Sequence, residues 1–172
     1  MVRVTSSFAF ALVMALPLAV EFPTGPDESH CVVVVIGQKP SGELITAPPV
    51  CVENRGVVRL WTGQSLALAG APGLEPESVK GLLTFNLGVH YDGFSGTGSS
   101  IAVVGSTCTG GYWNTPTAWD NRISSSWHGC AALRHYDLPG KGGSVQLTTG
   151  VGTIKNLGFM NNRAESVSYS AS

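Results

Sequence analysis

The chain carries few charged side chains, and no stretch of it gathers charge of one sign. Of its 172 residues, 10 are Lys or Arg and 11 are Asp or Glu, which gives a formal net charge of -1. Binding to nucleic acid or to an anionic membrane depends on clustered Lys and Arg side chains. Because the sequence has no such cluster, we expect no nucleic-acid partner.

The sequence also lacks the short motifs of common catalytic sites. It has neither G-x-S-x-G nor H-E-x-x-H, and no two of its four cysteines have the C-x-x-C spacing of redox and zinc sites. A Ser–His–Asp group can be imagined only from the separate positions Ser124, His128 and Asp92, and nothing local supports it. We therefore predict that the protein is not an enzyme.

Long hydrophobic runs are missing as well. The longest lies at 8–20, which is too short to cross a bilayer but has the length of a signal-peptide core. With Arg3 ahead of it, this run predicts an export signal at 1–20, a secreted protein and no membrane span in the mature chain. The alternative is a buried N-terminal segment.

The four cysteines agree with export, because an even number in an exported protein indicates disulfides. Cys31 and Cys51 bracket one segment, and Cys108 and Cys130 bracket another. Three pairings are possible, and the sequence does not choose among them. Pairing of nearest neighbours is the simplest.

The first half of the chain has three parts after the signal. Residues 21–30 have the Pro, Gly and acidic composition of a linker. The apolar run CVVVVIG at 31–37 predicts a buried strand, which opens a Cys-bracketed N-terminal segment at 31–81. Within that segment, a short helix could begin near Pro76.

The second half contains a tandem repeat of short strands and glycine-rich turns. The sequence HYD at 90–92 recurs at 135–137, and the polar block DNRISS at 120–125 is echoed by NNRAES at 161–166. Two units follow, 82–129 and 130–172. Because units of this size cannot bury a hydrophobic face alone, we expect them to pack as facing sheets.

The repeat resembles the pair of Greek-key motifs of the βγ-crystallin family, and the layout resembles its exported bacterial members. That family combines an aromatic–acidic hairpin, here YDGFSGTGS and YDLPGKGGS, with a calcium loop of the form Asn/Asp-Asn/Asp-x-x-Ser/Thr-Ser. DNRISS matches the loop at every position, and NNRAES differs only at Glu165. The resemblance implies an all-β fold, in which two Greek-key motifs form a βγ-crystallin-like sandwich over 82–172. A disulfide-closed β segment would precede it.

The resemblance also implies bound calcium. Ca²⁺ takes six to eight oxygen ligands, and in the family each ion is shared between the two motifs, with a contribution from the partner hairpin. The candidate ligands, with Arg122 and Arg163 acting through their carbonyls, are Asp92, Asp120, Asn121, Arg122, Ser124, Asp137, Asn161, Asn162, Arg163 and Glu165. With few carboxylates among them, affinity should be ~10⁻⁵ to 10⁻³ M.

Several residues near the loops have expected roles of their own. Glu165 leaves two readings open: its carboxylate reaches an ion, or its longer side chain crowds the loop. Ser125 and Ser166 should hold the turns by hydrogen bonds. Trp119 and Met160, at matching positions before the two loops, should lie in the core.

A second class of function remains as an alternative. The same scaffold would suit a secreted protease inhibitor, or an antimicrobial or toxin-like protein, whose partner is an extracellular protease or a cell-surface target. The best candidate for an active surface is the loop at 106–118, with exposed Tyr112 and Trp113 next to Cys108.

Overall fold

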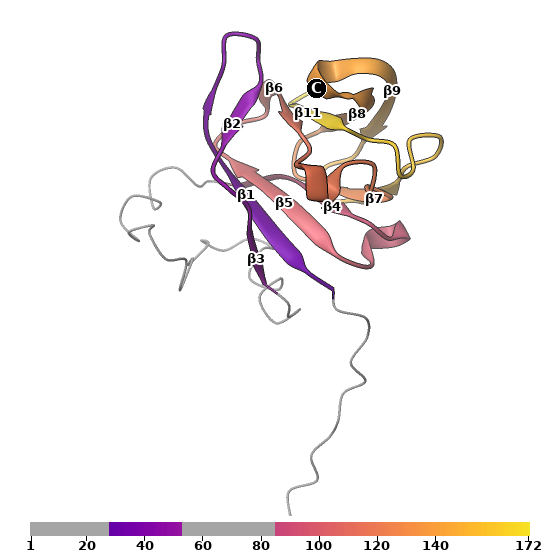
Figure 1. Cartoon of the computed structure of the whole chain (residues 1–172). Coiled ribbons are helices and arrows are strands. Elements are labelled where there is room, and N and C mark those ends of the chain that lie inside the picture. Colours follow the sequence, from indigo (N-terminus) through magenta and orange to yellow (C-terminus); the bar gives the residue numbers. More distant parts are fainter. Residues whose placement is uncertain (1–27, 53–84) are drawn as a thin grey trace, which may run out of the picture.

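The computed structural model describes residues 28–52 and 85–172, and this part of the chain is all-β (Figure 1). The strands are β1 (His30–Gln38), β2 (Leu44–Thr46), β3 (Val50–Val52), β4 (Phe85–Tyr91), β5 (Ser100–Gly105), β6 (Thr109–Asn114), β7 (Ser125–His128), β8 (Ala132–Leu138), β9 (Gly142–Thr149), β10 (Ile154–Asn156) and β11 (Ser166–Ser170). Three short 3₁₀ turns complete it: η2 (Phe94–Gly96), η3 (Thr117–Trp119) and η4 (Pro139–Lys141). The expected signal at 1–20, most of the linker and the possible helix near Pro76 lie outside the described residues.

The strand predicted from CVVVVIG is confirmed as β1, and it is an inner strand. It pairs in parallel with β5 on one side and antiparallel with β2 and β3 on the other. Neighbouring side chains on opposite faces, Val32 and Val33, are both buried. Burial on both faces explains why the segment is uniformly apolar rather than alternating.

The two disulfides join nearest neighbours along the chain. Cys31 lies directly opposite Cys51 across the β1–β3 pair and is bonded to it. Cys108 is bonded to Cys130, which is buried in the main core. The simplest of the three possible pairings is therefore the correct one.

The strands form two sheets whose order mixes the two repeats. The larger sheet runs β10-β7-β4-β5-β1-β2, with β3 also on β1, and the smaller runs β6-β11-β8-β9. The first unit supplies β4 to β7 and the second β8 to β11. In each unit the third strand leaves its own sheet and pairs with the last strand of the other unit. The two units are thus interlocked. From the repeat we expected each unit to form its own sheet and the two sheets to stack, but each sheet contains strands of both units.

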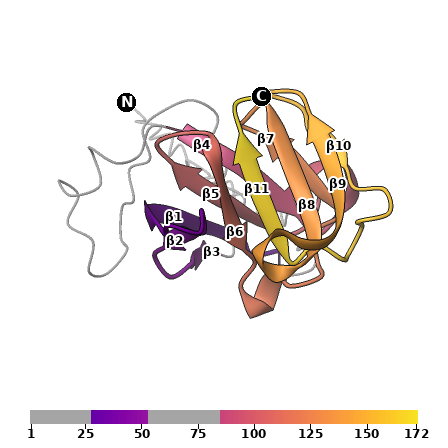
Figure 2. The same cartoon turned by 90° about the horizontal axis from the view of Figure 1, so that it is seen from above.

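The main core lies between the two sheets, which face each other in Figure 2. Leu87, Ile101 and Val103 of the larger sheet meet Leu133, Val167 and Tyr169 of the smaller one in a single buried cluster. Trp119 and Met160 belong to the same cluster, which confirms the role expected of them. A second apolar cluster, containing Val32, Val89, Ala102 and Val104, covers the other face of the larger sheet.

Removal of the Cys108–Cys130 disulfide should destabilise the sandwich. The bond closes a loop with a sequence separation of 22. Closing a loop of this size removes conformational entropy from the unfolded chain and so stabilises the fold by about 3 kcal/mol. We expect the double variant Cys108→Ala/Cys130→Ala to lose about that much unfolding free energy in a urea titration. A loss below about 1 kcal/mol would show that the native contacts alone hold this corner.

Candidate functional site

The two polar blocks, which we call cassette 1 (120–125) and cassette 2 (161–166), lie against each other. The backbone N–H of Asn121 donates to the carbonyl of Ala164 at 3.3 Å, and that of Asn162 donates to the carbonyl of Ile123 at 3.0 Å. Each bond is the repeat-equivalent of the other, so the cassettes meet around an approximate two-fold relation. The sequence alone did not reveal this contact.

The backbone at the second position of each cassette explains why Asn stands there. Asn121 has φ 56° and Asn162 has φ 54°. This left-handed conformation strains most side chains but is tolerated by Asn, whose short amide can bond locally. The turn directs both Asn side chains toward the opposite cassette.

The side chains repeat the reciprocal pattern of the backbone. Asn121 Nδ2 donates to Glu165 Oε1 at 3.2 Å, and Ser124 Oγ donates to Asn162 Oδ1 at 3.0 Å. In each case the second residue of one cassette meets the fifth residue of the other. Glu165 therefore reaches across to cassette 1 and does not fold back on its own loop.

Further oxygens gather beside the Asn121–Glu165 contact. Thr115 Oγ1 lies 3.4 Å from Asp120 Oδ1 and 3.1 Å from the carbonyl oxygen of Glu165. Thr115 follows β6 and was missed in the sequence, because it belongs to neither cassette. Two carboxylates, an amide, a hydroxyl and a carbonyl thus come from neighbouring residues.

The Ser124–Asn162 contact has a different chemical character. Its residues are neutral, and Asn161 takes the place that Asp120 has in cassette 1. Asn161 Oδ1 is buried and has no hydrogen-bond partner among residues 28–52 and 85–172. A buried polar atom has given up its hydrogen bonds to water, and this one has gained no protein partner in exchange. It is therefore available to a ligand.

Asp92 and Asp137, the acids of the two hairpins, bind arginine side chains. Arg122 Nη2 lies 2.6 Å from Asp92 Oδ2, and Arg163 Nη2 lies 2.9 Å from Asp137 Oδ2. These equivalent ion pairs tie each hairpin to the cassette of its own unit. Arg122 also packs over the Trp119 ring, at 5.2 Å from its centroid.

The final serine of each cassette holds the hairpin turn, as expected. Ser125 Oγ donates to the Gly93 carbonyl at 2.6 Å, and Ser166 Oγ donates to the Leu138 carbonyl at 2.8 Å. Each hydroxyl also accepts a backbone N–H from η2 or η4. These contacts satisfy polar groups in the turns.

The buried histidines form a separate polar group in the core. His90, His128 and His135 are all fully buried. Burial lowers the pKa of His90 well below its ordinary value, that of His128 to about 4 and that of His135 to about 3, and positive neighbours add to the effect. Burial also raises the pKa of Tyr169. The rings are therefore neutral at pH 7.

The imagined Ser–His–Asp group is not assembled. Ser124 Oγ bonds to Asn162, and the Asp92 carboxylate is paired with Arg122. Both ring nitrogens of His128 are buried without a hydrogen-bond partner in the described part of the chain. A general base must lie within hydrogen-bond reach of its nucleophile, so these three residues do not form a triad.

The expected exposed loop at 106–118 is wrong in its main feature. Its centre is the strand β6, and Tyr112 and Trp113 are only 7% and 3% exposed. Trp113 faces the core and stacks on His90, while Tyr112 is covered by the β1–β2 hairpin and by Lys141. Residues 106–118 therefore do not present two exposed aromatic side chains.

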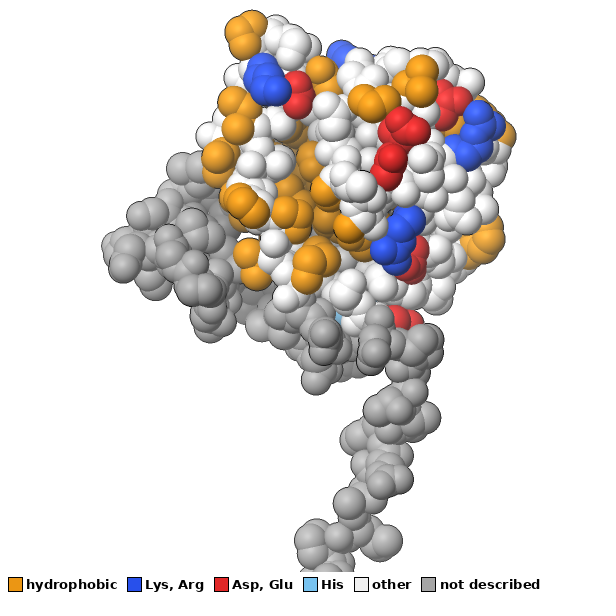
Figure 3. Space-filling view, viewed as in Figure 1, with side chains coloured by type: hydrophobic (Ala, Val, Ile, Leu, Met, Phe, Trp, Pro, Cys, Tyr) orange, Lys and Arg blue, Asp and Glu red, His pale blue; other side chains and the backbone are white. Residues whose placement is uncertain are grey.

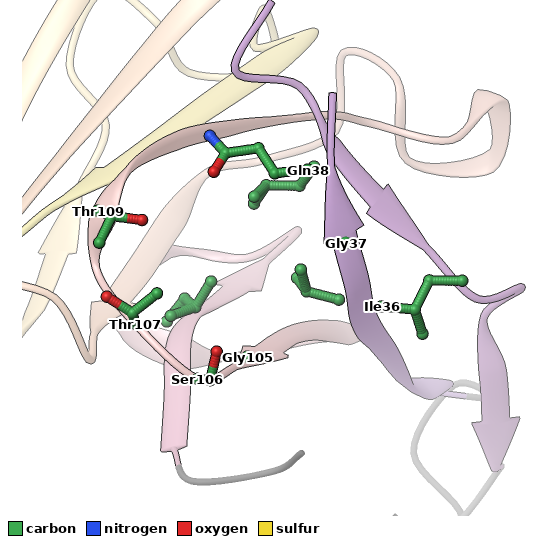
Figure 4. A pocket seen from close by; sticks show the side chains of 10 residues that line it. Ile36, Gly37, Gln38, Gly105, Ser106, Thr107 and Thr109 are labelled. Atoms are coloured by element: carbon green, nitrogen blue, oxygen red, sulfur yellow. The ribbon is translucent and has the colours of Figure 1, made fainter. Parts of the chain in front are cut away.

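A small pocket opens between β1 and the connection from β5 to β6. Its volume is about 240 Å³. In Figure 4, Thr107 and Thr109 lie across it from Gln38, and Figure 3 shows hydrophobic side chains gathered on this face. The volume is below the usual range for ligand sites, and none of its lining side chains is ionisable. We place no function there.

Within residues 28–52 and 85–172, no group of three or more His, Cys, Asp or Glu side chains is arranged to hold a metal ion. The cassette contacts use amide, hydroxyl and backbone oxygens as well as carboxylates.

In the part of the chain that the structure describes, no helix is long and apolar enough to cross a membrane. Comparison with protein-family models, curated proteins and solved structures found no match.

The hairpin glycines give a direct test of the repeated device. Gly98 and Gly143 have φ +79° and +70°, and a β carbon at either would collide with Oδ1 of Asp92 or Asp137. We expect Gly143→Ala to lower the unfolding free energy by about 2–3 kcal/mol, since strain adds to the steric clash. Gly140→Ala is the matched control.

Gly140 has a similar φ of +69° but open space around its β position. Its replacement should cost only the backbone strain, about 1 kcal/mol. Equal losses in the two variants, measured by urea unfolding, would contradict a specific role for the Asp137 contact.

Proposed function

We propose that the protein binds Ca²⁺ at two composite sites between the cassettes. The supporting observation is the reciprocal contact of second and fifth cassette residues, Asn121 with Glu165 and Asn162 with Ser124. Oxygen atoms from two separate units then converge at each place. This matches the preference of Ca²⁺ for several oxygen ligands of mixed type.

The two proposed sites differ in charge. Site 1 comprises Asp120, Asn121, Thr115 and Glu165, and site 2 comprises Ser124, Asn161 and Asn162. Ligand charge increases calcium affinity, so site 1 is the tighter one. The replacement of serine by Glu165 thus strengthens site 1, although Glu165 itself belongs to cassette 2.

Asp92 and Asp137 are left out of this ligand set. Each already has a charged partner at 2.9 Å or less, and its arginine would have to move before the carboxylate could turn to an ion. In the proposal these acids position the cassettes, and Arg122 and Arg163 provide the connecting side chains.

The interlocked topology supports a βγ-crystallin-like scaffold of two Greek-key motifs. A Greek key returns its fourth strand to lie beside its first, and here β7 lies beside β4 and β11 beside β8. The exchange of the third strand between sheets occurs in both units.

Export through a signal at 1–20 is part of the proposal and agrees with the two disulfides.

Calcium should stabilise the fold, because an ion that binds only the native state shifts the equilibrium toward it. At a free Ca²⁺ concentration about 100-fold above Kd, the expected gain is about 2.7 kcal/mol per site. Thermal unfolding in excess chelator and in millimolar Ca²⁺ measures it. An unchanged melting temperature contradicts the proposal.

Calorimetric titration of variants assigns the ligands. Glu165→Gln keeps the shape of the side chain and removes its charge, so it should weaken the first binding step by about tenfold or more. Asp137→Asn is the matched control, because it removes a carboxylate that is outside the ligand set. Because Asp137 positions a cassette without being a ligand, its replacement should weaken binding much less than Glu165→Gln does.

A loss of binding in Asp137→Asn with none in Glu165→Gln would favour the hairpin acids as ligands instead. No heat in the native protein at millimolar Ca²⁺ would contradict calcium binding at either place.

A further inference from the structure

A chain of hydrogen-bonded side chains crosses the core from one sheet to the other and back. Tyr169 Oη lies 2.8 Å from His90 Nε2, His90 Nδ1 lies 2.8 Å from Ser126 Oγ, and Ser126 Oγ lies 2.9 Å from His135 Nε2. Tyr169 and His135 belong to the smaller sheet, and His90 and Ser126 to the larger. All four side chains are at most 1% exposed.

All three hydrogen bonds of the chain can form when both rings are neutral. A neutral imidazole has one N–H donor and one acceptor nitrogen. In one of the two possible directions, Tyr169 donates to His90, His90 donates to Ser126, and Ser126 donates to His135. No donor of the chain then faces a donor, while His135 Nδ1, beyond the end of the chain, is buried without a hydrogen-bond partner among the described residues.

An added proton breaks this arrangement. If His90 is protonated, both its nitrogens donate, and the Tyr169 hydroxyl must turn its own hydrogen away from the chain. If His135 is protonated, Ser126 must reverse and donate to His90, His90 must donate to Tyr169 in turn, and the Tyr169 hydrogen must again turn away from the chain. A buried donor without an acceptor, together with a buried charge, is strongly unfavourable.

The surroundings offer no compensating negative charge. The pKa of His90 on β4 is lowered by burial and by repulsion from His135 on β8 and His128 on β7. The pKa of His128 is lowered by burial and by Lys155 on β10. From β11 the nearest ionisable group is Tyr169 itself, and β6 supplies the apolar ring of Trp113, stacked 5.7 Å from His90. From β5 come Ile101 and Val103. None of these groups is an acid.

We propose that this buried chain is an acid-sensitive latch between the two sheets. The sandwich is held closed while the rings of His90 and His135 are neutral, and it opens cooperatively when they take up protons, with the buried ring of His128 adding to the proton uptake. This property is independent of calcium binding, and it uses core residues that the proposed calcium sites do not.

The direction of the pH effect follows from linkage. In the unfolded chain a histidine takes up a proton as the pH falls through about 6.5, whereas in the fold His128 does so only near 4 and His135 near 3. Between these values unfolding binds protons, so stability falls as the pH falls. At pH 7 and above the latch carries no such penalty.

The test is urea unfolding of the full chain at several pH values between 6.5 and 5, above the range where most carboxylates titrate. The slope of unfolding free energy against pH gives the number of protons taken up. We expect about two to three for the native protein, from the three rings. His90→Gln and His135→Gln should each lower that number by about one.

Tyr169→Phe is the control, because it breaks a bond of the chain but keeps every titrating ring. It should lower the urea midpoint by a similar amount at each pH and leave the proton number unchanged. If the glutamine variants behave like Tyr169→Phe, the chain is structural only and the latch is overturned.

Nuclear magnetic resonance of the native protein provides a test that does not depend on variants. The ring signals of His90 and His135 should show no protonation in the folded protein down to about pH 5. Titration of either ring near pH 6.5 with the fold intact overturns the proposal, as does a native proton number below one.

Discussion

The exchange of the third strand between the two repeats is the constraint on which the rest of the sandwich depends. β6 leaves the first unit to pair with β11, and β10 leaves the second to pair with β7. Each unit must therefore send its chain back to its own sheet before it adds its last strand. The cassettes are these two return crossings, one in each direction. They meet because both crossings pass between the same two sheets.

The features that could be predicted from the sequence are those that depend on local chemistry. The HYD and NR repeats located two matching hairpins and two matching turns, and Asn121 and Asn162 do adopt the same left-handed backbone. The serines that end the cassettes and the apolar residues before them have the roles expected of them. These assignments require only the backbone preferences of a few adjacent residues.

The features that could not be predicted are contacts between distant segments. An apolar run indicates a buried strand but not its partner, so the sequence did not show the parallel pairing of β1 with β5. Tyr112 and Trp113 were expected to be exposed in a loop, yet both are covered by elements distant in the sequence. For the same reason the sequence did not show that Asp92 and Asp137 are the partners of Arg122 and Arg163, although all four residues had been noted.

The pairing of β1 with β5 has a consequence for how the protein is made. His30 bonds to Ser100, 70 positions further along the chain, so β1 leaves the ribosome well before its partner strand exists. Until then CVVVVIG is an uncharged, β-branched segment of the kind that joins with copies of itself. Production of the protein in quantity should therefore be limited less by the finished fold than by the interval in which this one segment is synthesised and still unpaired.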